Sequence, residues 1–332
     1  MTNIPTRKRC AYRARSGKAG RYFGMILLFV FGAACASPAI QRPRPPIVAT
    51  HTKIAILGGW ITADILVPKD IEGPVPAVIS PLNHGYDLLR AGIATVRFRT
   101  HWDTLRRFGK KAEGNTEEGA MGEDPAAAKK PLIGRWILAA DRPGIIGQGY
   151  FGIIAYEAYT AIPAVLDALH LIPAIDPGRI GIAGSSTSGF LALQAMAHDP
   201  RLHAGFVRAA TGDYRCFLRY SDLALGNDPR WLPGDKMTLD DTYTADLERI
   251  DPGNHLERFP PRTLLLITGQ DDTAIPAHCV ERFAGALQAA YLDAAMPDRF
   301  TWVELEDVGH NLPPETLDAA RSFWRRTFSS RQ

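Results

Sequence analysis

Three side chains of this sequence have the types that activate a hydroxyl group for nucleophilic attack. Ser186 lies in a run of small residues, Asp272 lies in a polar loop after an apolar run, and His310 follows Gly309 in a second polar loop. A serine hydroxyl is a poor nucleophile until a neighbouring base takes its proton, and imidazole is the usual base. An acid bonded to the other ring nitrogen holds the imidazole tautomer and stabilises the imidazolium. The chain therefore contains the parts of a Ser–His–Asp arrangement.

Ser186 lies between a predicted strand and a predicted helix. Residues 179–183 form a short apolar run typical of a buried strand, and residues 190–197 are rich in Leu, Ala, Gln and Met, which favour a helix. A strand that turns directly into a helix over small residues can hold a serine on a strained turn, with its hydroxyl above the sheet. The pattern predicts a serine nucleophile; the alternative is a Ser/Gly-rich loop that caps an ordinary helix.

The usual form of this turn is Gly-x-Ser-x-Gly, and the chain departs from it at one position. With Ser186 as nucleophile, Gly184 stands two residues before it, but Ser188 occupies the second glycine position and Gly189 follows one residue later. We expect Ser188, which is small, to be accommodated without loss of the sharp turn. A frame centred on Thr187 is the alternative, and it would make a threonine the nucleophile.

Two later predicted strands also end next to residues of catalytic type. Residues 263–268 lead into Asp271 and Asp272, and residues 300–305 lead into His310. Functional sites of parallel sheets form at the carboxyl ends of the strands. Three strand ends therefore supply a serine, an acid and a histidine in chain order. The alternatives are a turn and helix cap for the two acids and a solvated loop position for the histidine.

Apolar runs of strand length alternate with segments of helical periodicity over most of the chain, and this alternation predicts an α/β fold. We expect a mainly parallel, twisted sheet with helices on both faces and an antiparallel hairpin at its N-terminal end. The predicted strands are residues 52–57, 60–67, 77–79, 93–99, 179–183, 204–210, 263–268 and 300–305, and residues 176–178 predict a turn before the fifth of these. The predicted helices are residues 86–91, 151–170, 190–197, 277–292 and 314–328, with a kink or restart at Pro163.

Two segments interrupt this alternation with irregular sequence that contains Gly, Pro, charged and aromatic residues. They are residues 100–148 and 211–259, within a domain that runs from residue 48 to residue 330. Long irregular segments of this kind commonly line binding sites. We therefore expect these two insertions to determine which substrate is bound.

The N-terminal segment has the pattern of an export signal. Basic residues precede Met25, an apolar run of about ten residues follows, and small residues end it; such a run is too short to span a bilayer core of ~30 Å. One interpretation is a signal peptide of residues 1–36, cut before Ser37. The other is a lipoprotein signal of residues 1–34 that leaves a lipidated Cys35 attached to the membrane. Both predict a periplasmic or extracellular protein, with residues 37–47 as a proline-rich tether.

The composition is that of an ordinary globular protein and limits the partners. The chain has 332 residues, of which 46% are hydrophobic and 22% charged, and its formal charge of +3 is explained by the basic residues before Met25. The rest of the chain is near neutral, which gives no reason to expect nucleic acid. No cluster of cysteine and histidine has zinc-ligand spacing, and we expect neither metal nor cofactor. Cys216 and Cys279 either pair in an oxidising compartment or are two buried thiols.

Taken together, these motifs resemble those of the α/β-hydrolases, and most closely the branch of dienelactone hydrolase and prolyl-oligopeptidase-like enzymes. The resemblance runs from about Val48 to Phe328. It is carried by residues 58–68, by the Asp-Pro-Gly-Arg-Ile-Gly approach at 176–181, by the turn at Ser186, by the Gly-x-x-Asp-x-x-Ile-Pro loop at 269–276, and by Gly309-His310. The order serine, acid, histidine is also the order of that fold.

The resemblance implies roles for individual residues. It places the acid three residues after Gly269, which selects Asp272 over Asp271. It implies that the backbone N–H of Thr187 stabilises the oxyanion, with a second donor from Gly85 or Tyr86. The neighbouring His84 is equally consistent with a role at this site and with an ordinary loop position.

The activity implied is cleavage of a small-molecule carboxylic ester through an acyl-enzyme. A serine peptidase acting on small peptides is an alternative within the same fold. A non-catalytic envelope protein of this fold is the alternative from another class. The oligomeric state is not indicated by the sequence.

Overall fold

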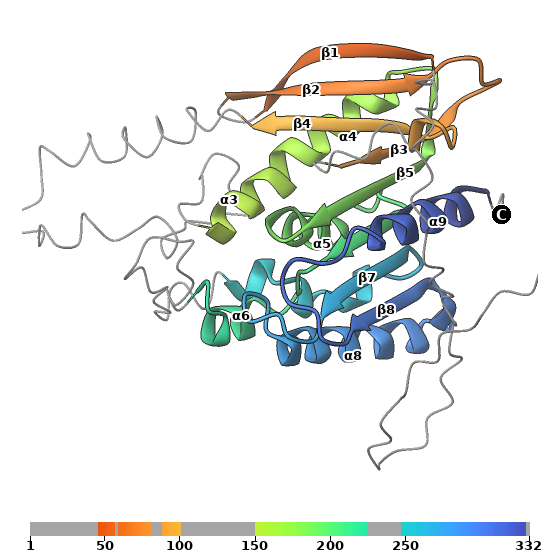
Figure 1. Cartoon of the computed structure of the whole chain (residues 1–332). Helices are drawn as coiled ribbons and strands as arrows, with labels where there is room; N and C mark the ends of the chain where they lie inside the picture. Colours follow the sequence, from red (N-terminus) through yellow and green to blue (C-terminus); the bar gives the residue numbers. More distant parts are fainter. Residues whose placement is uncertain (1–45, 57–58, 81–87, 101–149, 225–246, 330–332) are drawn as a thin grey trace, which may run out of the picture. The chain divides into compact units, whose positions relative to one another are not determined.

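The computed structural model describes residues 46–56, 59–80, 88–100, 150–224 and 247–329, all of which belong to one compact unit that begins at Arg44. A single eight-stranded sheet in the order β1-β2-β4-β3-β5-β6-β7-β8 runs through them, with β1 and β8 at its two edges (Figure 1). The strands are β1 Ile47–Ile56, β2 Gly59–Pro68, β3 Val75–Ile79, β4 Ala94–Thr100, β5 Ile175–Ser185, β6 Ala204–Arg208, β7 Thr263–Gly269 and β8 Phe300–Leu305.

The sheet is antiparallel at its N-terminal end and parallel elsewhere. β2 pairs antiparallel with both β1 and β4, and every pair from β4 through β3 to β8 is parallel. Parallel strands are buried on both faces, and the sequence of β3, Val-Pro-Ala-Val-Ile, is buried at all five positions. The predicted fold class, a mainly parallel sheet with an N-terminal antiparallel hairpin, is confirmed.

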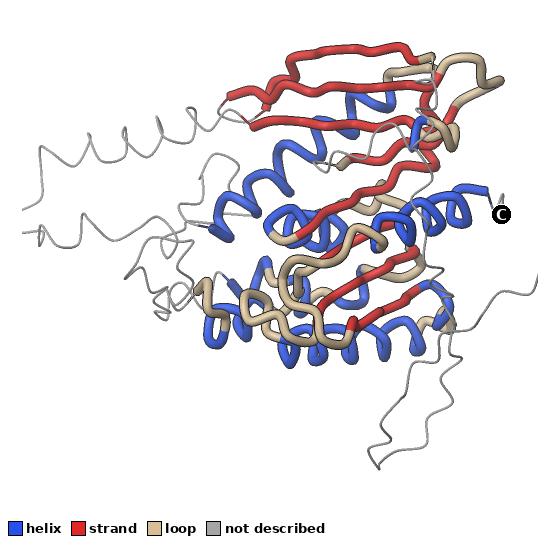
Figure 2. Tube along the Cα trace, in the orientation of Figure 1, coloured by secondary structure: helices blue, strands red, loops and turns tan. Residues whose placement is uncertain are grey.

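Helices cover both faces of this sheet (Figure 2). Along β7, Leu264 and Leu266 join one buried cluster, while Leu265 and Ile267 join the other. The first cluster includes α3 Tyr150–Tyr156, α4 Ile162–His170, α5 Thr187–His198 and α8 Ala277–Asp293, and the second includes α9 Thr316–Ser329. A further short helix, α6 Tyr214–Tyr220, follows β6.

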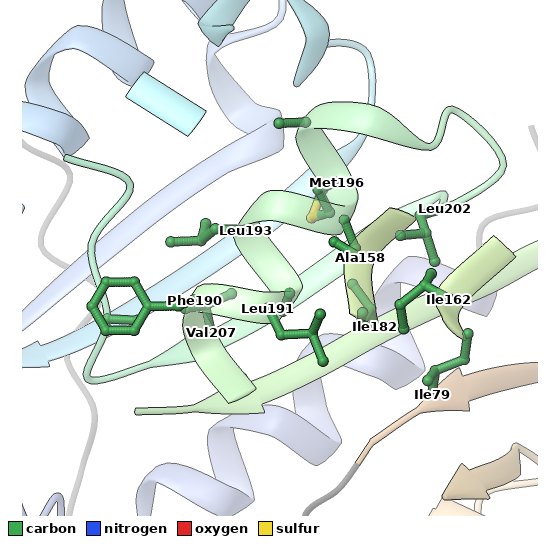
Figure 3. Close-up of a cluster of buried hydrophobic side chains, with 14 of the residues drawn as sticks. Ile79, Ala158, Ile162, Ile182, Phe190, Leu191, Leu193, Met196, Leu202 and Val207 are labelled. Carbon is green, nitrogen blue, oxygen red and sulfur yellow. The ribbon is translucent and has the colours of Figure 1, made fainter. Parts of the chain in front are cut away.

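The helix that follows Ser186 is deeply enclosed. Every residue of α5 from Gly189 to Ala197 is buried. Figure 3 shows Phe190, Leu193 and Met196 of this helix in the larger core cluster, together with Val207 of β6. A helix buried on all sides is fixed by close packing, so the turn at its N-terminus is held in one position.

Pro163 neither breaks nor ends the predicted helix of residues 151–170. A π-helical turn, Glu157–Ala161, joins α3 to α4, and Pro163 lies in the first turn of α4. Proline lacks the N–H that would bond back along the helix, and a wider turn before it accommodates this loss. The prediction of a kink or restart is therefore realised as a π-helical turn.

Several predicted boundaries shift. β1 begins at Ile47, inside the predicted tether, and β5 begins at Ile175, so the predicted turn of residues 176–178 lies within this strand, near a register irregularity opposite β3. There the Asp176 carboxylate accepts the Gly178 N–H at 2.9 Å. The ends of the predicted insertion 211–259 are packed into the core, with Tyr214 and Phe259 fully buried.

Other predictions fall largely outside the described residues. These are residues 1–45, which hold the predicted signal and Cys35, and residues 101–149 and 225–246 of the two predicted insertions. Of the predicted helix of residues 86–91, residues 88–91 are described: Leu88 and Leu89 are helical, and Arg90 and Ala91 form a turn. No helix among the described residues has the length and apolar character needed to cross a membrane.

Candidate active site

Ser186 occupies a strained turn between β5 and α5. β5 ends at Ser185 and α5 begins at Thr187, and Ser186 between them has φ 55° and ψ −124°. A positive φ is costly for a residue with a side chain and persists where surrounding contacts impose it. Here the Ser186 N–H donates to the Arg208 carbonyl at 3.0 Å, and the Ser186 carbonyl accepts the N–H groups of Gly189 and Phe190. These torsions belong to neither strand nor helix, as the predicted nucleophile turn requires.

Two glycines permit the close approach of the segments around this turn. A Cβ atom at Gly184 would lie 1.9 Å from the Ser188 carbonyl oxygen, and one at Gly189 would lie 2.7 Å from the Ala210 Cβ. Real side chains do not tolerate such distances, so both positions need glycine. The second small position of the motif is therefore filled three residues after Ser186, by Gly189, and not two residues after it.

Ser188 closes the turn with its own side chain. Its hydroxyl donates to the Ser185 carbonyl and accepts the Ser185 N–H, both at 2.9 Å. This pair of hydrogen bonds joins the end of β5 to the first turn of α5. Serine at this position is thus a bonded part of the turn.

Ser188→Ala is expected to destabilise the fold by about 1 kcal/mol, because one side-chain group with two bonds is lost. Ser188→Gly is expected to cost about 1 kcal/mol more, because glycine is unfavourable inside a helix. Urea unfolding of the two variants beside the wild type measures both effects. A Ser188→Gly variant as stable as the wild type would show that the two bonds contribute nothing to stability.

The structure brings Ser186, His310 and Asp272 together in one chain of hydrogen bonds. His310 Nε2 lies 3.0 Å from Ser186 Oγ, and His310 Nδ1 lies 2.9 Å from Asp272 Oδ2. Asp272 is 2% exposed, and its other oxygen accepts the Ile275 N–H at 2.8 Å. An ionised carboxylate on Nδ1–H leaves Nε2 as the acceptor for the serine proton. The arrangement can therefore generate a serine nucleophile.

Asp271, the other candidate acid, lies outside this chain. Its side chain is exposed, and its backbone N–H donates to the Val308 carbonyl at 2.9 Å. That bond joins the loop after β7 to the loop after β8. Asp271 thus contributes through its backbone to the approach of the two loops.

Gly269 makes the same approach possible. A Cβ atom here would lie 2.2 Å from the Val308 carbonyl oxygen and 2.7 Å from that of Gly309. Any side chain would push the loop after β7, which carries Asp272 (the acid loop), away from the loop after β8, which carries His310 (the histidine loop). The sequence drew attention to Gly269 only as part of a motif, whereas the structure shows that it sets the spacing between Asp272 and His310.

The candidate oxyanion donors are described only in part. Thr187 is the first residue of α5 and is exposed. Its backbone N–H directly follows Ser186, the position required of such a donor. Gly85, Tyr86 and His84 lie outside the described residues, so their roles remain predictions.

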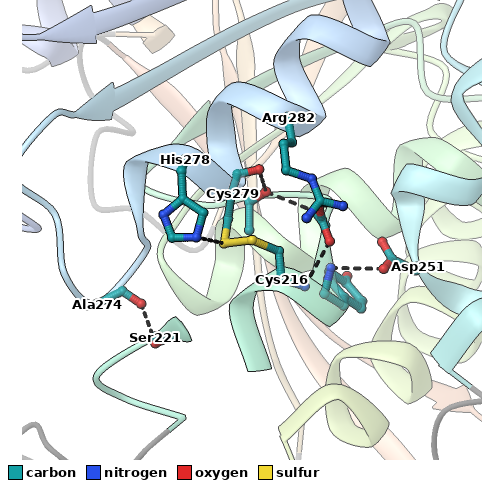
Figure 4. The surroundings of a disulfide bond; sticks show 10 residues. Cys216, Ser221, Asp251, Ala274, His278, Cys279 and Arg282 are labelled. Carbon is teal, nitrogen blue, oxygen red and sulfur yellow. Dashed lines mark hydrogen bonds and ion pairs between the residues drawn. A yellow bond between two sulfur atoms is a disulfide. The ribbon is translucent and has the colours of Figure 1, made fainter. Parts of the chain in front are cut away.

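The acid loop is attached to α6 by contacts that the sequence did not reveal. A disulfide joins Cys216 of α6 to Cys279 of α8, with Cα atoms 5.5 Å apart. The Ser221 hydroxyl donates to the Ala274 carbonyl at 2.6 Å, and the Asp222 N–H donates to the Thr273 carbonyl at 3.0 Å. Figure 4 shows the disulfide and the Ser221 bond. The segment that carries Asp272 is thus fixed covalently and by hydrogen bonds.

The disulfide decides between the two alternatives for these cysteines. The neighbouring His278 ring lies 3.5 Å from the Cys279 sulfur, so the three side chains resemble a metal-ligand cluster. A metal ligand must be a thiolate, and both sulfurs are bonded to each other. The cluster is therefore a structural cross-link.

Comparisons with known proteins agree with this fold. A model of the prolyl oligopeptidase family matches residues 157–321, which contain Ser186, Asp272 and His310. Esterase YjfP of Escherichia coli K12 is 28% identical over 150 residues, or 45% of this chain and 56% of the esterase. The match thus spans little more than half of that relative.

Solved structures show the same fold at low sequence identity. The acylaminoacyl peptidase of Pyrococcus horikoshii superposes with a TM-score of 0.59 at 14% identity, over 86% of this chain and 42% of the peptidase. A putative dienelactone hydrolase of Klebsiella pneumoniae superposes with a TM-score of 0.51 at 16% identity, over 86% of this chain and 99% of that one. With the sheet order and the turn at Ser186, these matches show that the chain has the fold of the α/β-hydrolases.

Proposed function

We propose that this protein is a serine hydrolase that cleaves carboxylic esters through an acyl-enzyme. The observation that carries the proposal is the hydrogen-bonded chain from Ser186 Oγ through His310 to the buried carboxylate of Asp272. The strained torsions of Ser186 support it, because they hold the hydroxyl at the carboxyl end of β5.

The proposed reaction follows from this geometry. His310 takes the proton of Ser186 as the hydroxyl attacks the ester carbonyl, and Asp272 stabilises the imidazolium. The backbone N–H of Thr187, with a second donor from Gly85 or Tyr86, stabilises the oxyanion. His310 then gives its proton to the leaving alcohol, and a water molecule activated in the same way releases the acid.

A peptidase is the second candidate, and the match to the prolyl oligopeptidase family favours it. The match to an esterase favours ester hydrolysis. An amide needs protonation of a poorer leaving group than an ester does, so paired substrates with the same acyl group separate the two. Hydrolysis of acyl p-nitrophenyl esters, but not of the matched anilides, supports the esterase; preferential cleavage of short peptides would assign the peptidase.

A fluorophosphonate probe tests the nucleophile directly. We expect labelling of the wild type and no labelling of Ser186→Ala, with a loss of about 10⁶ in kcat. Ser185→Ala, at the neighbouring position, is the matched control and should still be labelled. Equal labelling of the wild type and Ser186→Ala, or none of the wild type, would contradict the proposal and favour a non-catalytic envelope protein.

We also propose that the protein is exported. It is then either released by cleavage before Ser37 or attached to the membrane by a lipidated Cys35. The disulfide between Cys216 and Cys279 supports export, because disulfides persist in oxidising compartments. Cell fractionation and mass spectrometry of the mature N-terminus separate the two signals. An acylated Cys35 assigns the lipoprotein, and an unmodified chain beginning at Ser37 assigns simple cleavage.

A further inference from the structure

Arg208 is a buried arginine beside the nucleophile turn. It is the last residue of β6 and lies opposite Ser185 in the register with β5. Its backbone carbonyl accepts the N–H of Ser186. The residue is 8% exposed, and its Nη2 donates to the Leu312 carbonyl at 3.0 Å. Arg208 therefore connects the turn at Ser186 to the segment that carries His310.

The Leu312 carbonyl belongs to the same short turn as the histidine. The Leu312 N–H donates to the His310 carbonyl at 3.1 Å. The guanidinium thus binds Leu312, at the end of a turn that begins with His310. A shift of this turn would change the distance between His310 Nε2 and Ser186 Oγ directly.

Packing alone does not explain a buried guanidinium beside the turn at Ser186. The ion pairs among the described residues do not include Arg208, and its Nε has no hydrogen-bond partner there. Burial lowers the pKa of the guanidinium, which reflects the cost of keeping the charge away from water. An apolar side chain would fill the same space without this cost, but it could not bond a carbonyl.

We propose that Arg208 is a positioning residue that holds the His310 turn at hydrogen-bond distance from Ser186. This inference rests on the proposed function and adds to it a residue outside the Ser186–His310–Asp272 chain. Arg208 acts at two points. Its backbone fixes Ser186, and its side chain fixes the turn at Leu312, so one residue sets the position of nucleophile and base relative to each other.

Arg262 provides a matched control. It is also 8% exposed, and its side chain also donates to carbonyl groups, those of Phe259 and Asp199. It directly precedes β7, at the amino-terminal ends of the parallel strands, whereas Ser186 and Asp272 follow their carboxyl ends. Loss of either arginine removes a comparable buried charge and its bonds, but only Arg208 reaches the histidine turn.

The test compares Arg208→Met, Arg208→Lys and Arg262→Met by steady-state kinetics on one ester, with circular dichroism as the check of folding. We expect Arg208→Met to lose about 10- to 100-fold in kcat with little change in KM, because a displaced base slows the chemical step. Arg208→Lys, which keeps a donor, should recover part of this loss. Arg262→Met should retain kcat.

Hydrogen exchange supplies a readout that does not need activity. Amides of residues 308–312 should exchange faster in Arg208→Met than in the wild type and should be unchanged in Arg262→Met. Unchanged exchange there, an equal loss of kcat in both Met variants, or a change confined to KM would overturn the inference. If the wild type neither hydrolyses esters nor reacts with the fluorophosphonate, the proposed function fails, and exchange alone decides the role of Arg208.

Discussion

Asp272→Asn is expected to lower kcat by about 10⁴ while leaving the fold intact. An asparagine amide cannot accept the Nδ1–H of His310 as a carboxylate does. If the amide NH₂ faces Nδ1, the imidazole carries its proton on Nε2 and can no longer accept the proton of Ser186. Steady-state kinetics on an ester that the wild type hydrolyses, with thermal unfolding as the check of folding, measures this effect.

Asp271→Asn is the matched control for this experiment. Its side chain is exposed and its contact with the histidine loop is made by the backbone, so we expect kcat to stay within about threefold of the wild type. The comparison tests the choice of Asp272 over Asp271. A larger loss in Asp271→Asn than in Asp272→Asn would reverse the choice.

Removal of the disulfide is expected to have the largest effect on stability. Cys216 and Cys279 are 63 residues apart, and closing a loop of that length in the unfolded chain corresponds to about 4 kcal/mol in the chain-entropy model. The double variant Cys216→Ala and Cys279→Ala should therefore lose about this much free energy of unfolding in a urea titration. Both cysteines are almost fully buried, which makes Ala a suitable replacement.

Ser221→Ala is the control variant. It distinguishes the stability that comes from the disulfide from the stability that comes from the Ser221 hydrogen bond to the acid loop. It removes the hydrogen bond to the Ala274 carbonyl and those from the Leu223 and Ala224 N–H groups, without changing the connectivity of the unfolded chain. We expect it to cost about 1–3 kcal/mol, because buried backbone groups lose their partner. If the double cysteine variant is no less stable than Ser221→Ala, the cross-link does not stabilise the fold in the way proposed.

The sequence predicted most of the fold because its parallel strands are apolar throughout and are separated by clear turns. β8 was predicted with its observed bounds, and β7 to within one residue. The start of β5 was missed because Pro177 and Gly178 are typical of a turn, and the irregular register opposite β3 accommodates them within a strand. The segment 211–259 was expected to be an insertion because it is irregular and rich in Asp, Tyr, Trp and Pro, although Tyr214 and Phe259 in it are core residues.

The candidate site was predicted by the order of its residues along the chain, and the sequence could not show how they are held. Arg208 looked like an ordinary residue at the end of a strand, since nothing local indicates that its side chain reaches Leu312 across 104 positions. The Cys216–Cys279 pairing was left open for the same reason. Contacts of this kind depend on the packing of distant segments and have no local pattern.

The disulfide also changes the topology of the polypeptide. Together with the backbone, it closes a ring that starts in α6, passes through β7 and the acid loop, and returns at the first turn of α8. A single cut in the backbone between residues 216 and 279 opens this ring but leaves both fragments covalently joined. The peptide that bears Ser186 then stays tethered to the one that bears His310, and only reduction of the bond releases the two pieces.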